Sequence, residues 1–337
     1  MKLDVVTGAT GLLGSHVVEK LVSQGRQVRA VVRESSNTAF LESLGVEIVR
    51  GSLLDPSFHS RFLKDCDTVY HTAAKVGEWG PWRQFLENIV HPVKYLVAAA
   101  RESKVRRIVH VSSITVYGHP KEAQFPENED APVGQNLWRW DHYIRAKIQT
   151  EELARSHPGE VAILRPTWFF GPRDRTTLPR VLFAFSSKKI AQVGDGSNLI
   201  NLLYVGDIAD GVVRAGQSPQ AAGRTYNLTN PGELTQKEFL ALVAGELGFP
   251  TVKKKYSIWA AYMAGFFSEL AGKCLLLNRP PNLTRYTVGL MLRSTRFSIE
   301  RAKKEIGWQP TTTLSAALQT TLNWFFGQGK RPGPLAR

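Results

Sequence analysis

The chain has 337 residues, with 43 Lys or Arg against 29 Asp or Glu, so its formal net charge at pH 7 is +14. This length suffices for one large domain or two modest ones with proper cores. Only two cysteines, Cys66 and Cys274, are present, which excludes a disulfide framework, and because the first strand starts at once we expect no signal peptide and a cytoplasmic setting.

The first predicted elements are a strand, a glycine-rich turn, a helix and a second strand within residues 2–33, KLDVVTGATGLLGSHVVEKLVSQGRQVRAVVR. Residues 3–7 are apolar and β-branched, and the apolar residues from 17 to 22 follow helical spacing. Gly8 permits a tight turn, Gly11 lets the backbone approach a pyrophosphate, and Gly14 lets the helix lie close to the strand. This context predicts a dinucleotide-binding turn rather than a purely structural one.

The end of the second strand indicates which dinucleotide is preferred. A site for NAD usually carries an acidic residue near this point, where it bonds the ribose 2′-hydroxyl. Here the strand ends at Arg33, and Ser35, Ser36 and Asn37 follow. Positive charge and hydroxyl donors suit a 2′-phosphate, so we expect NADP(H) to be favoured over NAD. The alternative is that Arg33 is one more solvated base in a basic protein.

A second constellation follows a predicted strand at residues 107–111. Ser112 and Ser113 lie just after that strand, and Tyr143 and Lys147 lie four residues apart in a helix predicted over residues 143–156. Spacing of four places both side chains on one helix face. A nearby ammonium favours the phenolate form of a tyrosine and brings its pKa toward neutral pH. Lys147 is positioned to act in this way on Tyr143.

Together these motifs resemble the short-chain dehydrogenase/reductase superfamily in its extended form. The resemblance covers nearly the whole chain. It rests on TGATGLLG (7–14), GSLLDP (51–56), HTAA (71–74), ENIVHPVKYLVAAA (87–100), YIRAK (143–147), LRPTWFFGPRD (164–174), YVGDIADGVVRA (204–215) and RFSIERAKKEIGWQP (296–310).

Carried over by position, the resemblance implies that Ser113 hydrogen-bonds the substrate oxygen and Tyr143 transfers the proton. It also implies that Lys147 holds the nicotinamide ribose and lowers the pKa of Tyr143. Asn88 matches a mainly structural position. The positions matching the cofactor site are Gly8, Thr10, Gly11, Leu12, Leu13, Gly14, Arg33, Leu54, Asp55, Ala73, Tyr143, Lys147 and Pro166.

Two segments, HTAAKVGEWGPW and RTTLPR with VGDGSN, resemble the 3β-hydroxysteroid dehydrogenase-like branch. This branch includes sterol-carboxylate dehydrogenases and long-chain β-keto acid reductases, and it implies hydride transfer to or from an apolar substrate. Indole rings supply large apolar area, and five tryptophans fall in segments expected near the pocket: Trp79, Trp82, Trp138, Trp140 and Trp168. Two alternatives stay open: a nucleotide-sugar epimerase or dehydratase that retains tightly bound NAD, and a non-catalytic NADP-binding scaffold.

Residues 258–277, IWAAYMAGFFSELAGKCLLL, approach the length and apolarity of a membrane span. Glu269 and Lys273 would each cost roughly 2.5 to 3.5 kcal/mol near a bilayer centre, and as an i,i+4 pair they fit an amphipathic helix better. Lys253, Lys254 and Lys255 precede this helix directly. We therefore expect a lid or membrane-resting helix, with peripheral membrane contact through residues 253–277.

Alternating strands and helices predict an α/β fold: a doubly wound parallel Rossmann sheet with a smaller C-terminal substrate-binding lobe. Residues 1–165 are expected to form the nucleotide-binding domain, with residues 200–229 returning to it. Residues 166–199 and 230–328 would form the lobe, followed by a flexible tail at 329–337. The eight histidines lack ligand spacing, so no metal is expected, and no nucleic-acid motif is present. A homodimer is expected by analogy alone.

Overall fold

The computed structural model describes residues 2–75, 77–119, 128–187, 190–230, 234–275, 277, 280–281, 283–292 and 296–327. The tail expected at residues 329–337 lies outside this set. A seven-stranded sheet in the order β10-β6-β5-β4-β1-β2-β3 forms the centre of the fold, and every neighbouring pair runs parallel. Its strands are β1 (Leu3–Thr7), β2 (Gln27–Val32), β3 (Glu47–Arg50), β4 (Cys66–His71), β5 (Arg107–Val111), β6 (Glu160–Pro166) and β10 (Arg224–Leu228).

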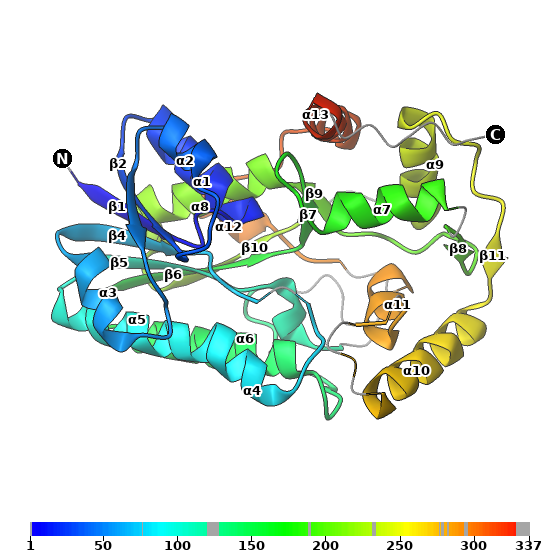
Figure 1. The fold of residues 1–337 in the computed structure, drawn as a ribbon, viewed down its shortest axis with the longest axis horizontal. Helices are drawn as coiled ribbons and strands as arrows, with labels where there is room; N and C mark the ends of the chain where they lie inside the picture. The colour runs from blue at the N-terminus through cyan, green and yellow to red at the C-terminus, as the bar shows by residue number, and fades with distance from the viewer. Residues whose placement is uncertain are drawn as a thin grey trace.

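Helices cover both faces of this sheet (Figure 1). One face carries α1 (Leu12–Ser23), α2 (Ala39–Ser43), α8 (Val205–Gln217) and α12 (Glu300–Ile306). The other carries α3 (Pro56–Leu63), α4 (Trp82–Phe85), the π-helix η1 (Leu86–Val90), α5 (His91–Glu102) and α6 (His142–Arg155). Because both faces are covered, the central strands are buried along most of their length on both sides. The fold is the Rossmann-type α/β sheet that the sequence predicts.

The chain leaves the sheet after β6 and returns to it with α8 and β10. A second group of elements lies beside the carboxyl ends of the strands and packs around two apolar clusters, a larger one and a smaller one formed by Val193, Ala261 and Val288. Its members are β7 (Trp168–Phe170), α7 (Thr177–Ser186), β8 (Gln192–Val193), β9 (Leu202–Tyr204), α9 (Gln236–Glu246), β11 (Lys255–Tyr256), α10 (Ile258–Cys274), α11 (Arg285–Leu292) and α13 (Leu314–Gly327). Within residues 230–328, α12 packs on α8 and β10 of the main sheet instead.

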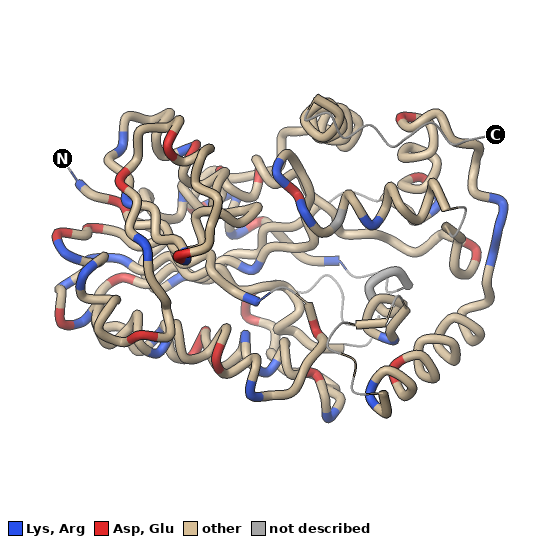
Figure 2. The backbone as a smooth tube through the Cα atoms, in the orientation of Figure 1, with Lys and Arg blue, Asp and Glu red and all other residues tan. Residues whose placement is uncertain are grey.

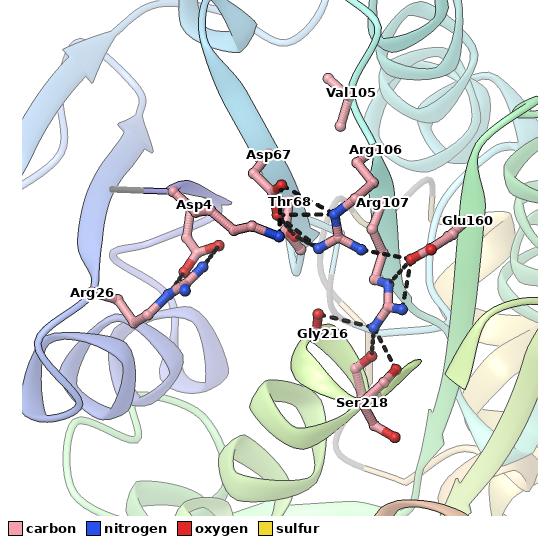
Figure 3. A network of polar contacts seen from close by, with 12 residues as sticks. Asp4, Arg26, Asp67, Thr68, Val105, Arg106, Arg107, Glu160, Gly216 and Ser218 are labelled. Carbon is pink, nitrogen blue, oxygen red and sulfur yellow. Dashed lines mark hydrogen bonds and ion pairs between the residues drawn. The ribbon is translucent and has the colours of Figure 1, made fainter. Parts of the chain in front are cut away.

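Ion pairs join the amino ends of the central strands (Figure 3). These pairs are Asp4 with Arg26, Asp67 with Arg106, and Glu160 with both Arg106 and Arg107. Arg107 is 1% exposed, and its guanidinium also donates to the carbonyls of Ala215, Gly216 and Ser218 at 2.9, 2.9 and 2.7 Å. Since those carbonyls end α8, Arg107 connects the returning helix to the sheet.

Five histidines are buried within the described fold, and burial lowers the pKa of each. His71 on β4 and His110 on β5 stack with ring centroids 5.7 Å apart, and both pKa values fall well below the usual range. Burial, with the Arg173 charge, lowers the pKa of His16 to about 3. The full set is His16, His59, His71, His110 and His157. These rings are neutral at pH 7.

Helix α10 occupies the stretch considered above for a membrane span. It has 17 residues and ends at Cys274. Among the helices in the described part of the chain, none is long and apolar enough to cross a bilayer. The described residues also contain no group of three or more His, Cys, Asp or Glu side chains arranged to hold a metal ion.

Candidate active site

The turn between β1 and α1 depends on glycines that side chains could not replace. Gly8 has φ +70°, and its carbonyl accepts the Gly11 N–H at 2.8 Å. A Cβ on Gly8 would lie 2.8 Å from the backbone of Ala73, and one on Gly14 would lie 2.2 Å from the Gly8 oxygen. Gly11 is the N-cap of α1 and offers no capping side chain. The N–H groups that open α1 therefore face outward over a compact cradle, which fits a pyrophosphate.

The other residues expected at this turn divide by side-chain exposure. Thr10 and Leu12 are half-buried beside it, whereas Leu13 is only 6% exposed and packs in the core. Leu13 can therefore meet a phosphate only through its backbone N–H. Ala73 follows β4 and approaches Gly8 closely, because Thr72 holds the carbonyl of Thr7 through its hydroxyl at 2.8 Å.

Arg33 follows the last residue of β2 and is exposed. In the part of the chain that the structure describes, its guanidinium has no hydrogen-bond or ion-pair partner. Arg50 on β3 holds the loop beyond it by donating to the carbonyls of Glu34 and Ser36 at 3.1 and 3.2 Å and to the Thr38 hydroxyl at 2.7 Å. Arg50 is thus committed to loop backbone, and Arg33 is available to a ligand.

Arg173 is a second cation that the sequence did not single out in this area. Its guanidinium lies 4.1 Å above the Phe40 ring and donates to the Ser15 hydroxyl of α1 at 2.9 Å. It also pairs with Glu19. The chain around Arg173 thereby docks on α1 and α2. Because Arg173 lies 140 residues from Arg33 in the chain, no local sequence pattern predicts that it lies in this area.

Leu54 and Asp55 lie in the loop between β3 and α3. Leu54 is 44% exposed, so its side chain is open to contact. Asp55 is the N-cap of α3, where Oδ1 accepts from the Ser57 N–H at 2.9 Å and the Ser57 hydroxyl at 2.7 Å. These hydrogen bonds hold the pKa of Asp55 below its usual value. The structure thus gives Asp55 a helix-capping function that the sequence analysis did not foresee.

Ser113, Tyr143 and Lys147 come together just beyond β5. Ser113 has an extended backbone, and its Oγ accepts from the Thr115 N–H at 3.2 Å and the Thr115 hydroxyl at 3.0 Å. The half-buried Tyr143 lies near Ser113, which favours its phenolate form. One turn further along α6, the Lys147 ammonium donates to the Val111 carbonyl at 2.9 Å. Pro166, also expected here, is the buried last residue of neighbouring β6.

The pKa values of Tyr143 and Lys147 are set by other groups than the sequence analysis expected. Burial raises the pKa of Tyr143 to about 12, and the group that acts against burial is Ser113. Burial lowers the pKa of Lys147 to about 8, against the opposing charge of Glu151. The sequence assigned the lowering of the Tyr143 pKa to Lys147. In the structure the Lys147 ammonium is instead hydrogen-bonded to Val111.

Glu151 extends this arrangement one further turn along α6. Burial would raise the pKa of Glu151, but the Arg165 guanidinium, at 2.9 and 2.8 Å from its two oxygens, brings the pKa below its usual value. Both side chains are nearly fully buried. A charged carboxylate therefore lies four residues after Lys147 and favours its protonated form.

Aromatic and polar side chains from distant segments surround Tyr143. Burial raises the pKa of Tyr286 on α11 well above its usual range, and the neighbouring Tyr143, Glu78 and Asp141 push it in the same direction. The Thr284 hydroxyl donates to Glu78 at 3.0 Å, which joins α11 to the loop after β4. Tyr286 lies 143 residues from Tyr143, so only the tertiary fold reveals the pair.

Four of the five tryptophans expected near the pocket lie around the start of α6. The Trp82 ring contacts His142, and Trp79 donates to the Leu277 carbonyl at 2.8 Å. The Arg285 guanidinium lies over the rings of Trp138 and Trp140 at 5.4 and 5.7 Å. The fifth, Trp168, packs against the larger apolar cluster of the second group of elements. Asn88, in the π-helix, is exposed and donates to the Gln84 carbonyl at 2.8 Å.

The charges of α10 pair differently from the expectation. Glu269 accepts from the Arg285 backbone N–H at 2.6 Å and from its guanidinium at 2.7 Å. The Lys273 ammonium lies over the Trp140 ring at 4.0 Å. Helical spacing permits a Glu269–Lys273 pair, but Arg285 offers Glu269 a backbone N–H as well as charge. Its ion pair therefore fastens α10 to α11.

Comparison with known proteins agrees with this geometry. The model of the NAD dependent epimerase/dehydratase family matches residues 5–229. The chain belongs to this family. It is therefore an enzyme of the extended short-chain dehydrogenase/reductase type, whose members are built around a nicotinamide dinucleotide, and its broad class is that of the family's oxidoreductases.

Named relatives span most of the chain. The 2-alkyl-3-oxoalkanoate reductase of Stenotrophomonas maltophilia is 28% identical over 94% of this chain and 97% of that protein. The mouse sterol-4-alpha-carboxylate 3-dehydrogenase, decarboxylating, is 26% identical over 96% of this chain and 91% of that protein. The crystal structure of UDP-glucuronic acid 4-epimerase from Bacillus cereus in complex with NAD matches with a TM-score of 0.75 at 21% identity, over 97% and 100% of the two chains. That last likeness concerns the fold.

Proposed function

We propose that this enzyme transfers hydride reversibly between NADP(H) and a secondary alcohol or ketone on an apolar substrate of the 3β-hydroxysteroid, sterol-carboxylate or long-chain β-keto acid type. The observation that carries the proposal is that Ser113 lies near enough to Tyr143 to favour its phenolate form, with Lys147 one helical turn away. These groups lie at the carboxyl ends of the strands, on the same edge of the sheet as the glycine turn.

Each of the three side chains has a distinct task in reduction. Tyr143 gives its phenolic proton to the oxygen of the forming alkoxide, and Ser113 donates a hydrogen bond to the same oxygen. Thr115 keeps Ser113 oriented through its own N–H and hydroxyl. The nicotinamide cofactor supplies or accepts the hydride when bound. Lys147, still mostly protonated at pH 7 with its pKa of about 8, would hold the ribose and contributes positive charge.

The residues near Tyr143 favour an apolar substrate. Phe85 is fully buried, and Trp82 and Leu86 pack with Tyr143 in the same apolar cluster. Two relatives, the 2-alkyl-3-oxoalkanoate reductase and the sterol-4-alpha-carboxylate 3-dehydrogenase, are named for alkyl and sterol substrates. Together with the branch resemblance, this supports a sterol or long acyl chain over a sugar nucleotide.

The test is to purify the protein without added cofactor, measure its nicotinamide content, and assay it with NADPH and NADH on sterol and long-chain β-keto substrates. We expect an empty enzyme that consumes NADPH with at least one substrate. Protein that retains NAD through dialysis and interconverts UDP-sugars would contradict the proposal in favour of an epimerase. Tight NADPH binding with no turnover on any of these substrates would favour a scaffold.

The cofactor preference has its own test at Arg33. Replacing Arg33 by Asp puts an acid where NAD sites carry one and removes the charge proposed to meet the 2′-phosphate. We expect NADPH to bind roughly tenfold or more weakly, with NADH little changed or improved, since one charged hydrogen bond contributes about 1.5 to 3 kcal/mol. Fluorescence titration measures both affinities. Arg61→Asp, on α3, is the matched control, and equal losses of NADPH affinity in both variants would show a nonspecific charge effect.

A further inference from the structure

Helix α10 exposes its bulky apolar side chains and buries its small residues, whereas a surface helix usually buries its apolar side chains. Its bulky apolar residues face outward: Trp259 is 73% exposed, Phe267 58% and Leu270 48%. With Met263 and Phe266 they follow spacings of three and four, so they share one face of the helix. We call these five residues the outer face. Exposed apolar surface gathered on one face of a helix marks a binding surface, whereas scattered apolar residues do not.

The opposite side of α10 is made of small residues and one paired acid. Ala261, Gly265, Glu269 and Gly272 are buried there. A Cβ on Gly265 would lie 3.0 Å from the Arg285 backbone nitrogen, and one on Gly272 would lie 3.2 Å from the Trp79 ring. Small residues thus let α10 pack closely on α11 and on the loop after β4. The helix is fixed to the protein mainly by this side. At the edge of the outer face the Arg285 guanidinium also lies 5.1 Å from the Phe266 ring, whereas Trp259, Phe267 and Leu270 are left exposed.

Positive charge lies at both ends of the outer face. Lys253, Lys254 and Lys255 are all exposed just before α10, and Lys273 lies in its last turn. Figure 2 shows these bases on the chain leading into α10 and at its far end. Exposed apolar residues continue past the helix at Leu275 and Leu277, which are 72% and 45% exposed. In a bilayer, anionic headgroups lie above apolar acyl chains. An apolar helix face with lysines at its ends can therefore contact both layers at once.

We propose that the outer face of α10 docks on an anionic lipid bilayer, with its aromatic and leucine side chains at the level of the acyl chains and the flanking lysines at the headgroups. A second copy of this chain fits less well. Pairing two outer faces would bring two sets of Lys253 to Lys255 into one interface, and each copy already carries a net charge of +14. An anionic membrane neutralises that charge instead.

This inference goes beyond the proposed function, because lipid docking requires no turnover. The two are connected through space, since Trp79 contacts α10 and lies in the loop that leads to the apolar cluster around Tyr143. A sterol or long acyl chain is concentrated in membranes. Docking at α10 would therefore bring the apolar cluster around Tyr143 close to the membrane in which such a substrate is dissolved.

The experiment measures sedimentation of the full chain with phosphatidylcholine vesicles that contain or lack phosphatidylglycerol. Wild-type protein is expected to bind the anionic vesicles, with a blue shift of tryptophan fluorescence from Trp259. The variant Trp259→Ser/Phe267→Ser/Leu270→Ser should bind on the order of 100-fold more weakly, because three large apolar side chains leave the lipid. Changing Lys253, Lys254 and Lys255 to Gln should weaken binding roughly tenfold or more and remove its dependence on phosphatidylglycerol.

The matched control is Phe183→Ser, whose side chain is 62% exposed and belongs to α7, a helix that Figure 1 shows apart from α10. It should bind vesicles like wild type. Circular dichroism and NADPH titration show that each variant is folded, independently of any activity. Wild-type protein that ignores anionic vesicles, or a triple variant that binds as well as wild type, would overturn the proposal. So would a wild-type dimer in sedimentation that the triple variant abolishes, since a second copy would then cover the outer face.

Discussion

The two ends of the central strands are built on opposite principles. At the amino ends, charged groups are paired and hydrogen-bonded, and Arg107 satisfies three carbonyls and Glu160 at once. At the carboxyl ends, burial lowers the pKa of Lys147 to about 8 and raises the pKa of the half-buried Tyr143 to about 12. Burial opposes the charged form of both groups. One end of the sheet therefore pairs its charges, whereas the other holds ionisable groups with shifted pKa values, which is typical of functional sites.

Changing the carboxyl end should affect turnover most. We expect Tyr143→Phe to lower kcat by on the order of 10³-fold, because it removes the proton donor, while NADPH affinity and the melting temperature change little. Stopped-time assays with calorimetry check all three quantities. Tyr95→Phe on α5 is the control, since its ring lies against His59 and His91, and it should keep full activity. Substantial turnover by the Tyr143→Phe variant would show that Tyr143 is not the proton donor.

Changing the amino end should affect stability instead. Arg107→Met leaves three carbonyls at the end of α8 without their donor, and we expect unfolding to become easier by about 3 to 5 kcal/mol. Denaturant titration measures this loss, and kcat per folded molecule should stay near that of wild type. The neighbouring Arg106→Met is the control. Its side chain is 36% exposed, so a cost of about 1 kcal/mol is expected.

A variant of Lys147 is expected to become more stable while it loses activity, which contrasts with the variants at the amino ends of the strands. The ammonium of Lys147 is unfavourably buried, since its pKa falls from 10.5 to about 8 on folding. Below pH 8 this burial costs at most about 3 kcal/mol, a cost that fades as pH rises from 8 toward 10.5. Lys147→Met should therefore raise the melting temperature at pH 7 while abolishing turnover. Lys94→Met, an exposed change on α5, should alter neither, and a destabilised Lys147 variant would contradict this account.

The sequence predicted the local parts of the structure well. The strand at residues 3–7, the strand at residues 107–111 and the helix holding Tyr143 form as expected, because short-range pattern decides them. The fold class and the family are confirmed. The site roles of Ser113, Tyr143 and Lys147 stay predictions, although the structure brings the three side chains together.

What the sequence missed depends on contacts between distant segments. The partner of Glu269 is Arg285, sixteen residues away, rather than Lys273 at helical spacing. The nearness of Tyr286 to Tyr143 follows from the docking of α11, and the role of Arg107 follows from the return of α8. No periodicity encodes such pairs. They arise from the register of strands and from the packing of one lobe on the other.

The buried histidines have a consequence for the conditions in which this fold survives. Each is neutral in the folded protein and would bind a proton near pH 6.5 when unfolded, so the unfolded state binds more protons below that pH. His16, His71 and His110, whose pKa values fall furthest, alone give a loss that approaches about 4 kcal/mol per pH unit. Equilibrium unfolding followed between pH 7 and 4 would show it as a steep fall. The same burial that keeps these rings neutral is thus expected to make the fold labile in acid.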